Sequence, residues 1–369
     1  MPIKWTRRDC LQRMVAAAAG GMAAQVSSRA EPSRLAMPGA WRGRVAAVEH
    51  PRAIVAGRYQ AEPVRQMMRR GMAELTGAGW VEAWRHFVQP GDVVGIKVNP
   101  VGGPRVISAP EVMREMIAGL TAAGIRPRDI VVYDRYRDQF LRAGFQKWLP
   151  EGVRTANAVA TYDEIQQGIE GYDPDHYVDM ALTLPGYDAL NLTARRSYAA
   201  RFITREVNKL INLAVLKDHQ SAGVTLALKN LSHGLVNNVS RSHSSPTLNA
   251  CGSFIPAVVS LPVIRNKAVL HILDGIQGVY HGGPGANPRF IWEHRTLYFA
   301  TDPVALDRVG WQAIDARRVE AGMQPLLQAP PDHFSTFVRR QPEHVEIAGA
   351  LGLGEADPEK IQVRRVKLT

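Results

Sequence analysis

A largely apolar run that stops abruptly at three polar residues constrains the fold of this chain more than any other stretch. The run extends from Leu210 to Leu216, and Lys217, Asp218 and His219 follow it directly. It is too short for a helix of ordinary length and is bounded by charge, which is typical of a buried parallel strand. Small residues occupy positions 221–223, and residues 224–231 then predict a helix that ends near residue 234.

A strand, a short polar turn and a helix N-terminus in succession make a place for a bound group. Open α/β sheets bind ligands beyond the carboxyl ends of their strands, and a helix N-terminus at that edge favours an anion. Lys217, His219 and Lys229 would bring two cations and an imidazole to this place. We therefore expect the protein to carry out its function here.

Other apolar runs along the chain predict further strands, several of them followed by helices. Residues 93–96 and 130–133 predict strands on either side of a helix that ends near residue 123, and such units cross over with a right hand. Residues 269–273 and 296–300 predict two more strands, and residues 304–319 predict a helix. The predicted fold class is α/β, with mostly parallel sheets flanked by helices and two lobes with a cleft between them.

Five of these strand-like runs end in polar residues. In a mostly parallel sheet the carboxyl ends gather on one rim, so these side chains would surround a common cleft. Polar residues are also ordinary at solvated strand ends, and the last of them is fully explained as a helix cap. The residues are Lys97 and Asn99, Asp134 and Arg135, Lys217 and His219, Asp274, and Asp302.

The chain divides into an N-terminal targeting segment, a linker and two expected lobes. Residues 1–30 contain Arg7 and Arg8, a short weakly apolar stretch and small residues suited to cleavage, and they resemble a twin-arginine export signal. A frayed N-terminal helix is the alternative. Residues 31–44 form the linker, residues 45–205 an N-terminal α/β lobe and residues 206–369 a C-terminal α/β lobe, and the two lobes make one unit. We expect a periplasmic protein that the twin-arginine machinery exports, without a stable membrane span in the mature chain.

The net charge of +11 does not by itself indicate a nucleic-acid partner. Residues 1–30 contribute five Lys or Arg and one Asp, which leaves 40 basic and 33 acidic residues scattered over the rest of the chain. No sustained basic run and no aromatic-rich basic motif of the RNA-binding kind occurs. A small anionic molecule therefore fits this charge better than nucleic acid does.

The two cysteines, Cys10 and Cys251, limit the redox chemistry of the chain. Removal of the signal would leave Cys251 alone, so the mature chain could form no intramolecular disulfide. A four-cysteine zinc site and an iron–sulfur cluster are excluded by the same count. Cys251 is either a nucleophile or, as we expect, a small buried thiol.

Three blocks of the sequence resemble domain of unknown function family 362 (DUF362). They are residues 94–99, residues 217–231, and residues 272–275 together with residues 301–307, in the order that the family has them. The resemblance spans roughly residues 93–314 and names a family more than an activity. Some relatives carry ferredoxin-type clusters, for which this chain lacks the cysteines.

The block from His219 to Lys229 is similar to the motif of the nickel-pincer lactate racemase family, in which a His, a Gly-x-Ser/Thr and a Lys share one strand-loop-helix unit. By that resemblance Lys229 would tether a pyridinium-derived cofactor, His219 would be the acid and base, and His233 or His243 would be a candidate metal ligand. The chain departs from the family in three ways. Leu231 and Ser232 stand where the family has Pro-Gly after the lysine, the paired catalytic-histidine signature upstream is absent, and no Asp-x-x-Arg motif stands near Asn99. The resemblance therefore implies the architecture more than the cofactor.

An imidazole beside two ammonium groups predicts proton-transfer chemistry. Neighbouring cations lower the pKa of His219, which leaves the ring neutral and able to accept a proton near neutral pH. Abstraction of a proton from a carbon next to a carboxylate needs such a base, with cations that hold the carboxylate and the enolate. The alternative is that the lysines pair with Asp218 or Asp274 and that His219 is a satisfied buried histidine.

The sequence thus predicts an enzyme that acts on a small anionic substrate by proton transfer, in the manner of an isomerase, racemase or lyase. A divalent metal or a Lys-tethered organic cofactor is the candidate cofactor, and an iron–sulfur cluster is not expected. The alternative is a periplasmic protein that binds an anion, a cofactor or a metal without catalysis. The catalytic candidates are His219, Lys217 and Lys229; the candidates for substrate or cofactor binding are Lys97, Asn99, Thr225, Asn230, Asp274 and Asp134; the candidate metal ligands are His233, His243 and His281.

Overall fold

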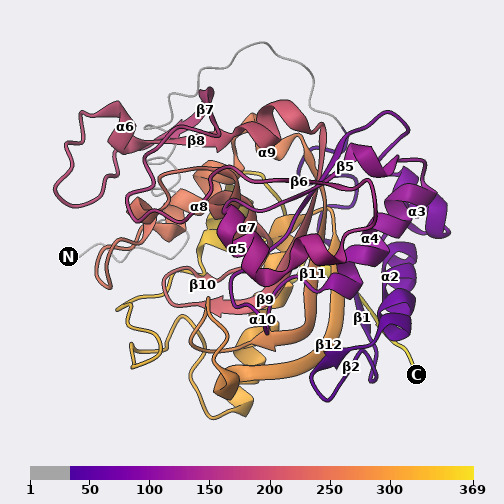
Figure 1. The fold of residues 1–369 in the computed structure, drawn as a ribbon. Coiled ribbons are helices and arrows are strands. Elements are labelled where there is room, and N and C mark those ends of the chain that lie inside the picture. Colours follow the sequence, from indigo (N-terminus) through magenta and orange to yellow (C-terminus); the bar gives the residue numbers. More distant parts are fainter. Residues whose placement is uncertain (1–33) are drawn as a thin grey trace.

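The computed structural model describes residues 34–369, and the predicted twin-arginine signal in residues 1–30 lies outside them. One large sheet runs through the molecule (Figure 1). Its strands are β1 (Arg44–Glu49), β4 (Val94–Lys97), β5 (Ile130–Tyr133), β6 (Arg154–Ala156), β9 (Lys209–His219), β10 (Gly223–Val224), β11 (Ala268–Val279), β12 (Ile291–Ala300) and β13 (Gln362–Lys367). They lie in the order β13-β1-β12-β11-β9-β4-β5-β6, and the short β10 pairs with β9.

Most neighbouring strands in this sheet are parallel. β6, β5, β4, β9 and β11 pair in parallel, as β13 does with β1, whereas β12 is antiparallel to both β11 and β1. The predicted α/β class with a mostly parallel sheet is therefore confirmed. Because β4 pairs with β9, strands from both expected lobes share one sheet, and the division into lobes stays a prediction.

Helices cover both faces of the sheet (Figure 1). α2 (Ala61–Thr76), α3 (Trp80–Arg85) and α4 (Pro110–Ala122) pack on one face, and α7 (Leu226–Leu235), α8 (Cys251–Val259), α10 (Pro303–Glu320) and α11 (His344–Ala350) lie on the other. Alternate strand residues separate the two cores: Ile211 and Leu213 face α2 to α4, while Leu210 and Ala214 face α7. Burial of both faces explains why β9 is apolar along most of its length.

The remaining elements are short. They are the helices α5 (Arg137–Ala143), α6 (Leu192–Arg195) and α9 (Pro262–Arg265), and two strand pairs outside the large sheet, β2 (Ile54–Val55) with β3 (Arg58–Tyr59) and β7 (Tyr172–Asp179) with β8 (Arg196–Ala200). The β7–β8 hairpin lies at the upper left of Figure 1. Within residues 34–369, no helix has both the length and the apolar character needed to cross a bilayer.

The chain changes direction across the sheet between β4 and β9. From β4 it continues through α4 to β5 and then β6, whereas from β9 it continues through α7, α8 and α9 to β11 on the opposite side. The two connections also use opposite faces, because α4 packs in one core and α7 in the other. Such a switch point opens a crevice outside the carboxyl ends of the strands, where open α/β sheets bind ligands.

Candidate functional site

β9 is longer than the sequence predicts and includes the polar residues at its end. Lys217, Asp218 and His219 belong to the strand rather than to a turn, because β10 pairs antiparallel with β9 and places Gly223 opposite His219. Gly223 has a φ of 76°, and a Cβ at this position would lie 2.6 Å from Cδ of Pro342. A glycine is thus required at this tight return, which leads the chain from β9 into α7.

The N-terminus of α7 does not offer the anion site that the sequence predicts. Asp307 of α10 already fills it, since its Oδ1 accepts a hydrogen bond from the Ala227 N–H at 2.7 Å and its Oδ2 accepts one from the Leu228 N–H at 2.8 Å. Asp307 is fully buried. The first N–H groups of the helix and its dipole are therefore satisfied by the carboxyl group of the protein itself. An anionic ligand has to be bound by side chains instead.

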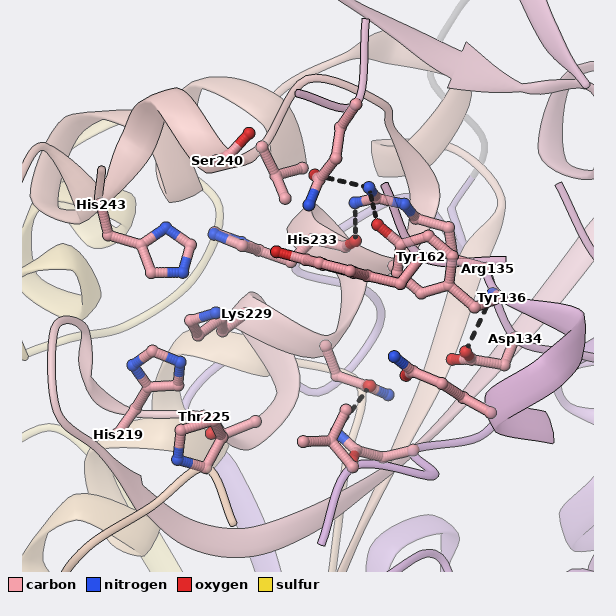
Figure 2. Close-up of a pocket in the computed structure, with 18 of the residues that line it drawn as sticks. Asp134, Arg135, Tyr136, Tyr162, His219, Thr225, Lys229, His233, Ser240 and His243 are labelled. Carbon is pink, nitrogen blue, oxygen red and sulfur yellow. Dashed lines mark hydrogen bonds between the residues drawn. The ribbon is translucent and has the colours of Figure 1, made fainter. Parts of the chain in front are cut away.

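A cavity of about 690 Å³ opens beyond the carboxyl ends of β4, β5 and β9 (Figure 2). Ten of the twelve residues that the sequence predicts for the site line this cavity, and two do not. The ten come from the ends of these three strands, from α7 and from the loop that follows α7. They are Lys97, Asn99, Asp134, Lys217, His219, Thr225, Lys229, Asn230, His233 and His243.

The charge of Lys97 is neutralised inside the protein. Its Nζ donates hydrogen bonds to Asp134 Oδ1 at 2.6 Å, to the Val98 carbonyl at 2.6 Å and to Asn230 Oδ1 at 3.3 Å. These three acceptors use all three N–H groups of the ammonium. Gly234 leaves room for the side chain, because a Cβ there would overlap Cε of Lys97. Lys97 and Asp134 therefore form a buried pair that adds no net charge to the cavity.

Two further lysines reach the cavity without an ion-pair partner among the described residues. Lys217 Nζ donates to Asn99 Oδ1 at 2.8 Å and to the Val101 carbonyl, which leaves one of its three N–H groups for a ligand. Burial, together with the nearby Lys229 and Lys97, lowers the pKa of Lys217 to about 7. Lys229 Nζ donates no hydrogen bond to any residue of the described chain, and burial lowers the pKa of Lys229 to about 8.

The hydrogen bonds of His219 indicate which ring nitrogen carries the proton. Its Nδ1 accepts from the backbone N–H groups of Ser221 at 3.2 Å and Ala222 at 3.3 Å, so a neutral ring has its proton on Nε2. Burial, and then Lys229, lowers the pKa of His219 well below its usual value. These contacts favour a neutral hydrogen-bond donor over the base that the sequence suggests.

Three histidines surround Lys229. Figure 2 shows the Lys229 side chain between the rings of His219 and His243, and the ring centroids of His219 and His233 lie 5.6 Å and 5.3 Å from that of His243. Burial, and then Lys229, lowers the pKa of all three imidazoles, to about 3 in His243. Burial brings the pKa of Lys229 toward neutrality and moves those of the imidazoles away from it, so Lys229 is the group best suited to exchange a proton.

His233, His243 and Cys251 form the candidate metal cluster of the described residues. One ligand atom from each lies within 4.8 Å of the other two. Imidazoles and a thiolate are the ligands that zinc and other thiophilic transition metals take. Ser242 gives the same arrangement a hydrogen-bonded explanation, because its Oγ lies 3.1 Å from His233 Nε2, 2.8 Å from His243 Nδ1 and 3.9 Å from Cys251 Sγ. Cys251 is buried, as expected, but it lies beside the site.

His281 does not join this cluster. Its Nε2 lies 3.0 Å from Asp332 Oδ2, and its Nδ1 lies 3.1 Å from Nη1 of Arg318. It does not line the cavity. The structure therefore pairs His281 with the end of α10 and supplies Cys251 where the sequence predicts a third histidine.

Asp274 lies within β11, which is longer than the sequence predicts, Asp302 follows β12, and neither lines the cavity. The Asp274 side chain points to the opposite face of the sheet, where its Oδ2 accepts from the Ala109 N–H at 3.1 Å and its Oδ1 from the Tyr59 hydroxyl at 3.2 Å. Asp302 follows β12, whose antiparallel direction puts its end at the other edge of the sheet. There Asp302 caps α10, as the sequence predicts, and accepts from the Val304 N–H at 3.0 Å.

Arg135, Tyr136 and Gln166 form a polar clamp over the cavity, and of these the sequence places only Arg135 at the cleft, without naming it as a binding residue. Arg135 donates to the His233 carbonyl at 3.0 Å and to Gln166 Oε1 at 2.6 Å, and it also contacts the Tyr136 hydroxyl. Its position directly after β5 is the signal by which the sequence places Arg135 at the cleft. Gln166 comes from the irregular segment after residue 150, where no periodic pattern marks it.

Comparison with known proteins identifies a family and no activity. A family model described as "Domain of unknown function (DUF362)" matches residues 94–312, which is more than half of the chain and confirms the resemblance drawn from the sequence. No curated protein matches. Similar solved structures include a Thermotoga maritima protein determined by the Northeast Structural Genomics Consortium, with 12% identity, a TM-score of 0.33 and coverage of 61% of this chain and 52% of that one. This chain spans about half of that protein, and we draw nothing from so low a TM-score.

Proposed function

This chain belongs to the DUF362 family, whose description leaves its activity open, and we propose that it is an enzyme that binds a small anionic molecule and transfers a proton on that molecule. One observation carries the proposal. Lys229 Nζ, without a hydrogen-bond partner among residues 34–369, reaches the cavity beside three histidines and close to Lys217. An amine held in this way is available for chemistry rather than for structure.

The charge of the cavity supports an anionic ligand. Six charged side chains line it, four of them cationic and two anionic, and one pair of opposite charge is internally balanced. In a site shielded from bulk water, the surplus positive charge attracts an anion more strongly than it would at the surface. The cationic residues are Lys97, Arg135, Lys217 and Lys229, and the anionic residues are Asp134 and Glu164.

Proton transfer next to a carboxylate would use three of these groups. Lys217 binds the carboxylate through its remaining N–H, and His219 donates from Nε2 to the oxygen that becomes negative when the C–H bond breaks. Neutral Lys229 takes the proton from carbon and, as the ammonium, returns it. One proton leaves and one returns, and the ammonium of Lys229 can exchange its protons with solvent in between, so no oxidant or second substrate is needed and the reaction class is isomerisation or racemisation.

A binding protein without catalysis is the second candidate, and the cluster of His233, His243 and Cys251 favours it. These residues fit a thiophilic divalent metal, which when bound would act as a Lewis acid next to the anion. Lys229 also offers the free amine that a tethered organic cofactor would need. The metal content of the purified protein shows whether it binds a metal, and its intact mass shows whether it carries a tethered cofactor.

We also propose that the twin-arginine machinery exports this chain to the periplasm. The support is the sequence of residues 1–30, with Arg7 and Arg8 ahead of a weakly apolar stretch and small residues. Replacement of both arginines by lysine is expected to retain the full chain in the cytoplasm. Export of that variant at the wild-type level would contradict the proposal.

Exchange of hydrogen at carbon tests the proposed reaction directly. A panel of α-hydroxy carboxylates is incubated with the protein in heavy water, and loss of the NMR signal of the C–H next to the carboxylate is followed. We expect exchange in at least one compound, its loss in Lys229→Met, and its retention in the control Lys360→Met, which changes an exposed lysine. Binding measured in the same samples discriminates between the candidates, because binding without exchange supports the second one and an absence of both overturns the proposal.

A further inference from the structure

The cavity continues from its cationic end to an apolar rim. The rim is formed by loop residues on either side of β7, and three of its side chains are both large and exposed: Tyr162 by 52%, Ile165 by 45% and Tyr187 by 38%. Leu184 and Pro185 line the cavity beside them. Exposed apolar side chains at the mouth of a cavity are typical of a surface that receives an apolar group.

Residues 162–192, which include the rim, hold a large share of the exposed apolar side chains of the described chain. Six of the thirteen exposed large apolar residues within residues 34–369 lie between residues 162 and 192. Three of the six line the cavity, and three do not, namely Ile169, Leu190 and Leu192. The three residues that do not line the cavity can therefore serve as matched controls for substitutions of those that do.

Contacts with the site hold the lining part of the rim in place. The ring of Tyr162 packs edge-on against that of Tyr136, with centroids 5.5 Å apart and an angle of 64° between the planes. Tyr136 is covered by the Arg135 guanidinium, 4.5 Å from its ring centroid, and Arg135 also donates to Gln166 at 2.6 Å. The rim is thus tied to the carboxyl end of β5 and forms one wall of the cavity.

The cavity is larger than a simple carboxylate needs. About 690 Å³ lies in the range that encloses a drug-sized ligand. A three-carbon hydroxy acid bound by Lys217 beside Lys229 would occupy only the cationic end. The part bounded by Tyr162 and Ile165 would then contribute nothing to recognition.

We infer that the ligand is an amphipathic carboxylate, whose acid group binds Lys217 and whose apolar part, at least as large as a phenyl ring, lies on Tyr162 and Ile165. This inference rests on the proposed function, since one cavity holds both ends of the ligand. Tyr162 and Ile165 determine specificity and take no part in the chemistry. Aromatic rings at the rim suit this task, because they offer large apolar faces with few rotatable bonds.

Propionate and phenylpropionate test the inference, because they share a carboxylate and differ by a phenyl group. Binding of each to the full chain is measured by calorimetry and by ligand-observed NMR at one pH and one salt concentration. We expect phenylpropionate to bind roughly tenfold more tightly than propionate, because its ring is removed from water when it packs against the rim. Tyr162→Ala and Ile165→Ala should remove most of this difference and leave propionate unaffected. Ile169→Ala and Leu190→Ala, the matched controls, should change neither affinity.

The outcomes separate this inference from the function on which it rests. Equal affinity for the two acids, or an effect of Ile169→Ala as large as that of Tyr162→Ala, overturns the inference and leaves the anion site in place. Phenylpropanol keeps the ring and lacks the charge, so that binding as tight as that of the acid overturns carboxylate recognition and the proposed function with it. No binding of either acid overturns both. The rim residues are about half exposed, so these variants are expected to fold, and their thermal midpoints verify this.

Discussion

The ammonium group of Lys217 donates a hydrogen bond to the amide oxygen of Asn99 at 2.8 Å. The amide nitrogen of Asn99 donates in turn to Asn230 Oδ1 at 3.1 Å, and the same oxygen accepts from Lys97. Neutral amides therefore separate two buried lysines that differ in their partners. Lys97 has the carboxylate of Asp134, whereas Lys217 has only neutral acceptors, which makes Lys217 the cation that a ligand can use.

Anion binding should weaken as the pH rises, because Lys217 loses its charge. Burial lowers the pKa of Lys217 to about 7, so the ammonium predominates below that pH and the neutral amine above it. We expect the affinity for phenylpropionate to fall several-fold between about pH 6 and about pH 8, and a bound carboxylate to move this fall toward higher pH. Calorimetry over this range checks the prediction. Lys217→Met should bind weakly at every pH, and a constant affinity in the wild type would contradict the prediction.

Removal of the carboxylate from the buried ion pair should destabilise the protein. Asp134→Asn leaves Lys97, which is 2% exposed, without its acid partner, and we expect a loss of about 3 kcal/mol or more in the free energy of unfolding. Lys97→Met added to this variant should recover part of the loss, because it removes the orphaned charge. Urea unfolding at neutral pH measures both.

The control for the buried pair is an exposed one on α5. Asp138 pairs with Arg142, which is 72% exposed, at 2.8 Å. Asp138→Asn should change the free energy of unfolding by less than about 1 kcal/mol. If Asp134→Asn and Asp138→Asn lose the same free energy of unfolding, burial does not make the pair of Lys97 and Asp134 more stabilising than an exposed pair.

Loss of the carboxyl group that caps α7 should weaken both stability and anion binding. Asp307→Ala leaves the buried N–H groups of Ala227 and Leu228 without acceptors, which we expect to cost about 2 kcal/mol or more of the free energy of unfolding. Because α7 carries Lys229, the affinity for phenylpropionate should fall as well. Asp357→Ala, which changes an acidic side chain outside the core, should leave the free energy of unfolding nearly unchanged. If Asp307→Ala is destabilised but binds phenylpropionate as tightly as the wild type, the cap stabilises the fold without supporting the site, which would contradict the second half of the prediction.

Cys251, rather than His281, is expected to complete a metal site with His233 and His243. Titration of the full chain with cobalt(II) should give a near-ultraviolet thiolate charge-transfer band, which a chelator removes. The band should disappear in Cys251→Ser and in His243→Ala and persist in His281→Ala. No band in the wild type would leave the hydrogen bonds to Ser242 as the complete explanation of the cluster.

Local pattern in the sequence was sufficient to predict which polar residues follow strands. Short apolar runs bounded by charge predict β4, β5 and β9, and Lys97, Asp134 and Lys217 stand at their ends. This worked because strands buried on both faces are apolar throughout, so that the first polar residues mark the sheet edge. The blocks that carry the family resemblance are likewise contiguous stretches, and the family match confirms them.

Only the tertiary structure decided which of those strand ends share a cavity. The antiparallel direction of β12 sends Asp302 to the other edge of the sheet, and side-chain alternation along β11 turns Asp274 to the other face. α10 delivers Asp307 to the N-terminus of α7, where the sequence predicts a ligand anion, and α8 brings Cys251 to the histidines. Each of these contacts joins segments that are distant in sequence. The direction of a strand, the face to which its side chains point and the position of a helix are set by packing between elements rather than by the residues within one element.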